Sequence, residues 1–292
     1  MFRTFANHVF VIVLLLTTAH ATRAQIVVAN FDTTVNDRFS NSSDFILDGF
    51  DVTGVGRVDG GARWATAISR NVVVSANHAR PSLGDTITFN TNNDPNGPTV
   101  SRTITSSLRV TNTSAGTFGD VWLGVLDGDL PASIASYSFL DQPLSFGLLP
   151  SLQTEAYFFG RPSGATINTG QTVGTNRITG FWEDFTLNGG TLGTSDYLYA
   201  TDDPPGAPNY LDNEASLQVG DSGAPVFVAD GSDLLLLGTN ALRQPNGLNY
   251  LGNEADEINA FISVNATASV PEPSCCLVLS ALMGPVLLRR RR

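Results

Sequence analysis

Lysine is absent from the 292-residue sequence, so all sixteen basic residues are arginines. Without lysine, the chain cannot use a serine–lysine pair or form a Schiff base with a carbonyl substrate. Cysteine is nearly absent too, because Cys275 and Cys276 both lie in an apolar stretch near the C-terminus. The region that must fold therefore has no disulfide, no thiolate metal site and no cysteine nucleophile.

Histidine and positive charge are also scarce. Histidine occurs only at positions 8, 20 and 78, and the first two fall in a segment that we expect to be removed. A zinc site made of three histidines is thereby excluded, and we expect no metal and no cofactor. Residues 25–270 contain ten arginines against 26 acidic residues, a formal net charge of −16. Such an acidic surface repels nucleic acid, so no nucleic-acid partner is expected.

The N-terminus has the pattern of a secretory signal peptide. Residues 1–24 combine Arg3, an apolar run from Val9 to Leu16 and small residues before Gln25, as export signals do. The apolar run is too short to span a membrane stably. We therefore expect an exported protein with residues 25–53 as an N-terminal extension of the folded region.

The C-terminus, residues 265–292, carries a second targeting pattern. Pro271-Glu272-Pro273 precedes a fourteen-residue apolar segment, 275–288, and then four arginines. A short apolar segment ended by arginines would stop in a membrane with the arginines in the cytoplasm. This pattern resembles the PEP-CTERM sorting signal of Gram-negative bacteria, which implies processing by an exosortase, transient anchoring in the inner membrane, and a final place at the cell surface or outside. A plain tail anchor, with permanent attachment, is the alternative.

Between the two ends, the sequence predicts many short strands and one helix. Clusters of Gly, Pro, Asn and Asp separate β-branched runs. Strands are expected at Trp64–Ser69, Asn71–Ala76, Thr86–Phe89, Thr103–Val110, Val121–Leu126, Glu155–Phe159, Tyr197–Ala200, Pro225–Val228 and Leu234–Gly238. Asn253–Ile262 is expected to form an amphipathic helix. The pattern favours an all-β sandwich or a pair of barrels.

Three motifs carry residues with hydrolytic chemistry. His78 stands in Ser75-Ala76-Asn77-His78-Ala79 after an apolar run. Further along the chain, Asp120 opens the apolar strand Val121–Leu126. Ser222 stands in Gly220-Asp221-Ser222-Gly223-Ala224-Pro225, a turn whose glycines let backbone amides point one way. A histidine that takes a proton from a serine, with a carboxylate to orient it, is the arrangement needed for nucleophilic hydrolysis.

These motifs, in the order His, Asp, Ser, resemble those of the trypsin/chymotrypsin family of serine peptidases. The resemblance implies two six-stranded β-barrels, approximately 54–145 and 146–264, with a C-terminal helix. It implies a catalytic triad of His78, Asp120 and Ser222, an oxyanion hole from the amides of Gly220 and Ser222, a protein or peptide substrate, and a monomer. Asp127 is an alternative to Asp120.

The sequence departs from the family at several places. Asn77 and Ala224 stand where the family has alanine and glycine, and Ala79 replaces a cysteine. The family's free Ile-Val-Gly-Gly terminus, which pairs with the acid before the serine, has no obvious counterpart, so the partner of Asp221 stays open. Two other classes of function also stay open: a protease-fold binding module without activity, and a non-enzymatic β-rich component of an extracellular matrix.

The sequence indicates the substrate specificity less clearly than it indicates the triad. The residue six before the serine, Ser216, takes the place of the family's pocket base, which argues against cleavage after arginine or lysine and favours an apolar or small side chain. Glu214 could change that inference if the loop is shifted. Asp202-Asp203 and the stretch from Asp212 to Glu214 could also bind calcium, although they match no known calcium loop.

Overall fold

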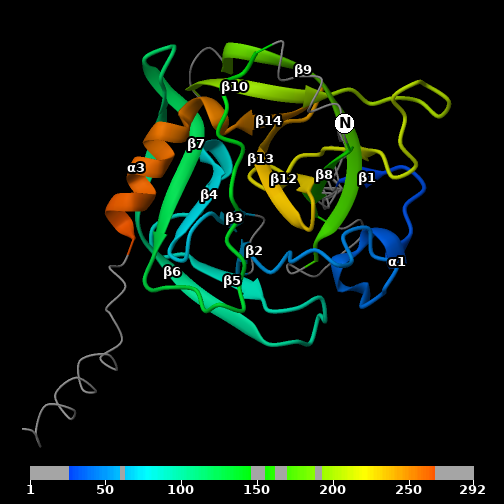
Figure 1. Ribbon diagram of the computed structural model, residues 1–292, viewed down its shortest axis with the longest axis horizontal. Helices are drawn as coiled ribbons and strands as arrows, with labels where there is room; N and C mark the ends of the chain where they lie inside the picture. Colours follow the sequence, from blue (N-terminus) through cyan, green and yellow to red (C-terminus); the bar gives the residue numbers. More distant parts are fainter. Residues whose placement is uncertain (1–25, 60–62, 146–154, 162–169, 188–192, 267–292) are drawn as a thin grey trace, which may run out of the picture.

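The computed structural model describes residues 26–59, 63–145, 155–161, 170–187 and 193–266 (Figure 1). The predicted signal peptide, 1–24, and the apolar segment 275–288 of the predicted sorting tail lie outside these ranges. Among the described residues, no helix is long and apolar enough to cross a membrane.

The first barrel is closed by six antiparallel strands in the order β2-β3-β4-β7-β6-β5. Their bounds are β2 Val55–Val58, β3 Trp64–Ala67, β4 Val72–Ala76, β5 Thr86–Asn90, β6 Thr99–Asn112 and β7 Thr117–Leu126. β4 is buried at every residue, and β7 from Gly119 onward, because these strands also contact the second barrel through β13 and β10. Burial on both faces explains why they appear in the sequence as continuous apolar runs.

The second barrel is closed in the order β10-β14-β13-β12-β8-β9. Its strands are β8 Glu155–Gly160, β9 Thr172–Leu187, β10 Gly193–Ala200, β12 Pro225–Asp230, β13 Asp233–Leu242 and β14 Asn246–Tyr250. All neighbours pair antiparallel. The resemblance to a double β-barrel is therefore confirmed in the number of barrels and in the number of strands in each.

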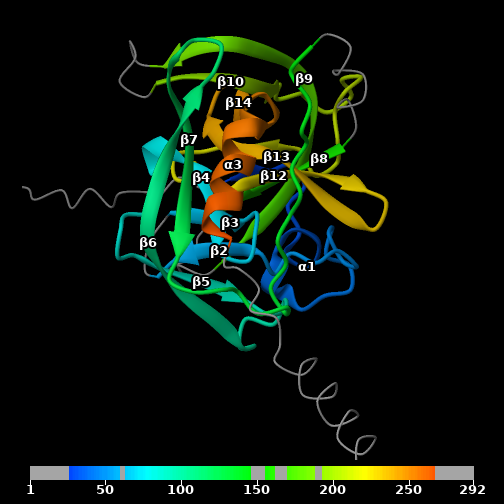
Figure 2. The same cartoon turned by 60° about the vertical axis from the view of Figure 1, so that its left-hand side comes forward.

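The two barrels lie side by side and share one core (Figures 1 and 2). A single cluster of buried side chains joins Trp64, Val74 and Leu123 of the first barrel to Phe159 and Phe227 of the second. Phe227 meets Phe159 edge to face, with ring centroids 5.7 Å apart. The barrels are thus held against each other largely by removal of apolar surface from water.

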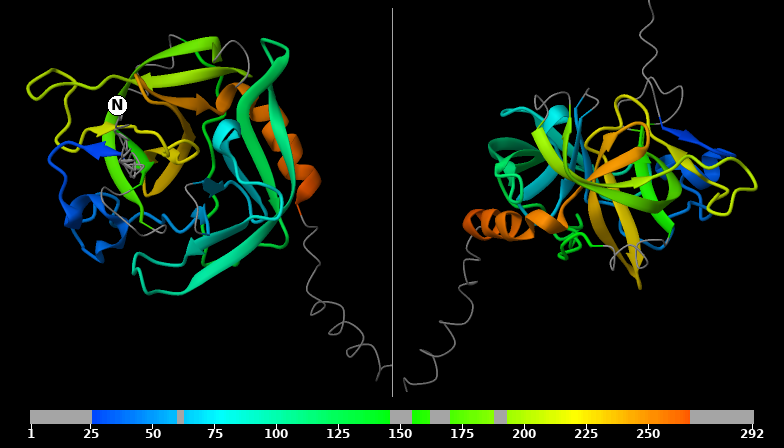
Figure 3. Two further views of the ribbon diagram at one scale, coloured as in Figure 1. Left: turned by 180° about the vertical axis from the view of Figure 1, so that it is seen from behind. Right: turned by 90° about the horizontal axis from the view of Figure 1, so that it is seen from above.

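The N-terminal segment lies along the second barrel. It contains β1 Val27–Val28, α1 Thr33–Asn36 and the 3-10 helix η1 Arg38–Ser40. β1 pairs with β11, Ala215–Ser216, and the amide of Asn36 donates to Val173 O of β9 at 3.0 Å. Figure 3 shows from behind that this segment and the C-terminal helix lie on opposite sides of the molecule.

The C-terminal helix leaves the second barrel and returns to the first. The 3-10 helix η4, Gly252–Glu254, leads into α3, Ala255–Asn265, which lies beside β6 and β7 in Figure 1. The Glu257 carboxylate accepts from Thr111 N at 3.0 Å, and the Asn71 amide donates to Asn265 O. The helix predicted at Asn253–Ile262 is confirmed, with its start two residues later and its end three residues later.

Candidate active site

The structure brings His78 and Asp120 into direct contact. His78 lies in the 3-10 helix η2, Asn77–Ala79, directly after β4, and Asp120 lies near the start of β7, which pairs with β4. His78 Nδ1 is 2.7 Å from Asp120 Oδ2, and His78 N donates to Asp120 Oδ1 at 2.9 Å. The histidine side chain is 18% exposed and the aspartate side chain 0%. Because a carboxylate only accepts, Nδ1 carries the proton and Nε2 is left free to accept one.

Asp120 is fixed from the second barrel as well. Its backbone N donates to Ser195 Oγ of β10 at 2.6 Å, and its carboxylate accepts from Asn249 Nδ2 of β14 at 3.2 Å. The alternative aspartate, Asp127, is exposed beyond the far end of β7. Asp120, and not Asp127, is therefore the aspartate that orients His78.

The serine turn packs against the strand that leads to His78. A Cβ at Gly223 would collide with Ser75 Oγ, three residues before the histidine, and Gly223 has a φ of +85°. Trp64 of the first barrel donates from Nε1 to Gly220 O at 3.4 Å. Ser222, half-buried between these two glycines, is placed at the junction of the barrels next to η2. Within the described residues, Ser222 Oγ makes no hydrogen bond, and such bonds are often long without substrate.

Two amides of the serine turn have no partner. The amides of Asp221, Gly223 and Ala224 donate to Gln218 O, Asn240 O and Asp221 O. In the part of the chain that the structure describes, the amides of Gly220 and Ser222 donate to nothing. Unpaired amides two residues apart, beside a serine, are available to an oxyanion.

The structure supplies the partners of Asp221 that the sequence left open. The Asp221 side chain is fully buried and accepts from Arg161 N at 2.9 Å, from Gln218 N at 2.8 Å and from the backbone of Ile26. The guanidinium of Arg161 adds a favourable charge. Ile26 stands two residues beyond the predicted signal-peptide cut and packs against Gly160. Backbone amides and an arginine thus hold the acid before the serine.

Stability is expected to fall as the pH rises through the titration of Asp221. Burial raises the pKa of this carboxyl from 3.8 to about 7, against the opposing amides of Arg161 and Gln218. The folded protein therefore binds the proton more tightly than the unfolded chain between about pH 4 and about pH 7. The free energy of unfolding decreases across that window and is level above it.

Asp221→Asn provides the reference for this prediction, because it keeps the shape of the side chain and removes its titration. Urea unfolding of both proteins from about pH 4 to about pH 8 gives their difference in unfolding free energy. From about pH 4 to about pH 7, the wild type should become progressively less stable relative to Asp221→Asn. Above about pH 7 the difference should stay constant. A difference that does not depend on pH would contradict the raised pKa of the buried Asp221 carboxyl.

The residues expected to affect specificity lie in a network of hydrogen bonds. Ser216, on β11, donates to Asp202 Oδ2 at 3.1 Å, and Asn246 donates to the other oxygen at 2.6 Å. Glu214 is buried and accepts from Leu211 N and Asp203 N, and its pKa is raised, mainly by burial. Among the described residues, no group of three or more His, Cys, Asp or Glu could hold a metal ion. Glu214 therefore organises its own loop.

Asn77 is hydrogen-bonded to Arg80. Its carbonyl and its side-chain oxygen both accept from Arg80 Nη1, at 2.7 and 2.9 Å. The departure from the family's alanine is thus accommodated within η2, and it leaves the contact of His78 with Asp120 intact.

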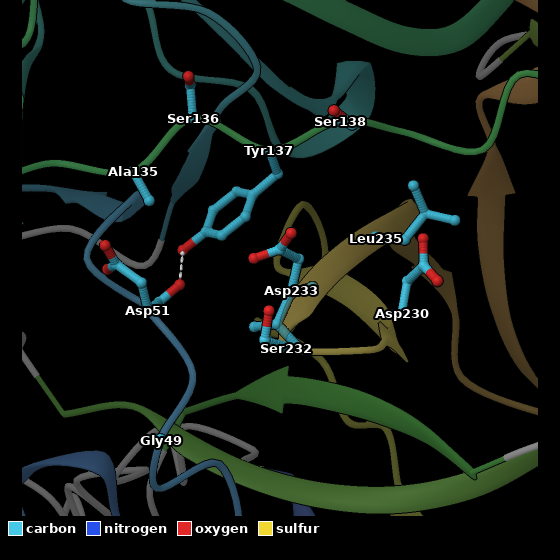
Figure 4. A pocket seen from close by; sticks show the side chains of 11 residues that line it. Gly49, Asp51, Ala135, Ser136, Tyr137, Ser138, Asp230, Ser232, Asp233 and Leu235 are labelled. Carbon is cyan, nitrogen blue, oxygen red and sulfur yellow. Dashed lines mark hydrogen bonds between the residues drawn. The ribbon is translucent and has the colours of Figure 1, made fainter.

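A separate cavity of about 480 Å³ opens elsewhere on the molecule. Figure 4 shows Asp51 of the N-terminal segment, Tyr137 from the connection between the barrels and Asp233 of the β12–β13 hairpin around it. The hydroxyl of Tyr137 donates to Asp51 O at 3.0 Å. None of His78, Asp120 and Ser222 lines this cavity, so it is distinct from the candidate active site.

The two closed six-stranded barrels and the order of their strands define the class of fold. It is a chymotrypsin-like double β-barrel, which is a protease-like fold. No family model matches the sequence, and no curated protein sequence matches it. Among solved structures, a mutant of human heparin binding protein matches with a TM-score of 0.50 and 16% sequence identity, over 74% of this chain and 93% of that chain. At this identity the likeness establishes the fold alone.

Proposed function

We propose that the protein is an exported serine endopeptidase that hydrolyses peptide bonds with His78, Asp120 and Ser222. The observation that supports this most is the 2.7 Å contact of His78 Nδ1 with a fully buried carboxylate, made beside a serine turn at the junction of two barrels. The approach of Gly223 to Ser75, three residues before the histidine, supports the pairing of His78 with Ser222.

Each group has a defined part in the proposed reaction. His78 Nε2 takes the proton of Ser222 as Oγ attacks the scissile carbonyl, and the Asp120 carboxylate stabilises the imidazolium that forms. The negative oxygen of the tetrahedral intermediate accepts from the amides of Gly220 and Ser222. His78 then gives its proton to the leaving amine, and water releases the acyl group from Ser222 by the same steps in reverse order.

A fluorophosphonate probe tests the proposal directly, because it reacts with activated serines. The exported protein should be labelled on one serine, and labelling should be lost in both Ser222→Ala and His78→Ala. Circular dichroism and thermal melting establish that the variants are folded. A folded wild type that is not labelled would contradict the proposal and favour the inactive binding module. Hydrolysis of labelled casein, absent in Ser222→Ala, distinguishes the enzyme from a matrix component.

The remaining parts of the proposal concern substrate and location. With Ser216 in the place of the pocket base, we propose cleavage after apolar or small side chains. The acid before the serine is held by Arg161, Gln218 and Ile26, which supports an enzyme that needs no further activating cut. The terminal patterns in the sequence support export, with a tail that an exosortase processes. The resemblance to the trypsin/chymotrypsin family supports a monomer.

A further inference from the structure

Asn249 lies in the second barrel and contacts the Asp120 carboxylate of the first barrel. It lies on β14 between β10 and β13 and is fully buried. Its Nδ2 donates to Asp120 Oδ2 and to Asp120 O, both at 3.2 Å. The same Oδ2 accepts from His78 Nδ1. Asn249 therefore touches the atom on which the orientation of the histidine depends.

The surroundings fix which end of the Asn249 amide faces Asp120. Both neighbouring atoms of Asp120 are oxygens that can only accept, so the NH₂ group has to point toward them. The other end, Oδ1, is buried and has no hydrogen-bond partner among the described residues. A buried oxygen without a partner destabilises the fold. Stability alone therefore does not favour asparagine over an apolar residue of the same size.

We propose that Asn249 is a positioning residue of the candidate active site, a role that rests on the proposed function. Its Nδ2 holds Oδ2 of Asp120 in line with His78 Nδ1 and stabilises the charged carboxylate. The carboxylate in turn keeps the proton of the imidazole on Nδ1. No motif in the sequence marks Asn249, because it acts through Asp120 and not on the substrate.

Few other groups that titrate face Asp120. His78 contacts it from η2, and Tyr197 of β10 faces it with a pKa that is raised by burial first and then by the charge of Asp120. Asp196 also raises the pKa of Tyr197, and its carboxylate is bonded to Asn253 Nδ2 and Asp184 N. Because its pKa is raised, Tyr197 stays protonated at any pH used for the assay and adds no charge beside Asp120.

The test is the second-order rate constant for fluorophosphonate labelling of the full chain, measured across pH. Asn249→Leu keeps the branched shape of the side chain and removes the donor. Losing a hydrogen bond to a charged group should lower the rate roughly 10-fold or more. It should also move the acidic limb of the profile to higher pH, because a less stabilised carboxylate holds the imidazolium more tightly. A purely structural role would leave the limb in place.

Asn249→Asp gives a signature of a different kind. The introduced carboxyl would face the Asp120 carboxylate, and two facing carboxyls retain one proton between them. While protonated, the introduced group can still donate to Oδ2. The rate of this variant should therefore fall on the alkaline side, where the wild type stays level. Because aspartate has the shape of asparagine, this variant tests the positioning role of Asn249 even if the leucine variant does not fold.

Thr239→Val is the matched control. Thr239 pairs with Asn249 on the adjacent strand and is fully buried, and its hydroxyl has no partner within the described residues. Among the described residues it contacts none of His78, Asp120 and Ser222 through its side chain, so its variant should keep the wild-type rate and profile. Wild-type behaviour of both Asn249 variants would overturn the role of Asn249 and leave the proposed function standing. Absence of labelling in the wild type would overturn both.

Discussion

Replacing Asp120 by asparagine is expected to lower the hydrolysis of labelled casein by about 10⁴-fold. Three donors converge on this carboxylate: His78 N on Oδ1, and His78 Nδ1 and Asn249 Nδ2 on Oδ2. An amide offers only one accepting oxygen, so at least one donor must face an NH₂ group in either orientation. With the NH₂ group in the place of Oδ2, the imidazole loses the contact that keeps its proton on Nδ1, and Nε2 is no longer free to accept from Ser222. With the amide oxygen there, the contact is kept, but a neutral group no longer stabilises the imidazolium.

Asp127→Asn is the control for this experiment, since Asp127 lies on the same chain segment but is exposed and away from His78. It should hydrolyse casein at the wild-type rate. Both variants should keep the wild-type melting temperature within a few degrees, because Asp120→Asn preserves size and most hydrogen bonds. Activity of Asp120→Asn within about tenfold of the wild type would mean that Asp120 does not orient the base.

Replacing Arg38 by methionine is expected to destabilise the protein by about 4 kcal/mol. This arginine is fully buried in the N-terminal segment, and burial lowers its pKa to about 10, so it stays charged. Its guanidinium makes five hydrogen bonds, with Val55 O, Asn90 O, Asn92 O, Asn93 Oδ1 and Gln171 Oε1. The first four acceptors belong to the first barrel and its β5–β6 turn, and Gln171 belongs to the second, so methionine would leave buried acceptors unpaired on both sides.

Thermal melting checks this prediction, with an expected decrease in Tm on the order of 10 °C. Arg63→Ala is the control, because the Arg63–Asp85 ion pair is a surface contact with the arginine side chain 46% exposed. Exposed pairs contribute about 1 kcal/mol or less. Equal melting temperatures of the two variants would show that Arg38 does not tie the N-terminal segment to the barrels.

The strands that the sequence predicted well are those that are buried on both faces or carry clear β-branched runs. β12 begins where expected, β4 begins one residue later and ends where expected, and β3 ends two residues earlier. The predicted strand Thr103–Val110 is the centre of a longer one, β6, which extends at both ends through mainly polar residues. β2, β9 and β14 were missed. β2 has only four residues, with Gly56 and Arg57 between two valines, and glycine, asparagine and threonine interrupt the apolar residues of β9 and β14. In these strands ladder hydrogen bonds and the closing of a barrel override a weak local preference.

The sequence could indicate the candidate site only where a motif is local. His78, Asp120 and Ser222 lie in short recognisable patterns, and the structure places the first two in contact. Asn249, Ser195 and Arg161 have no such pattern, since each becomes relevant only when strands distant in sequence meet. The partner of Asp221 was missed for the same reason: Ile26 approaches it only because β1 pairs with β11.

The division of the candidate site between the barrels also determines the stage of folding at which the site is assembled. His78 and Asp120 belong to the first barrel. Ser222, Asn249, which donates to the Asp120 carboxylate, and Ser195, which accepts from Asp120 N, belong to the second. Domains of this kind fold as units and dock afterwards. For the proposed peptidase, the site is complete only after the two barrels have docked, so a half-folded chain is expected to cleave no peptide bond.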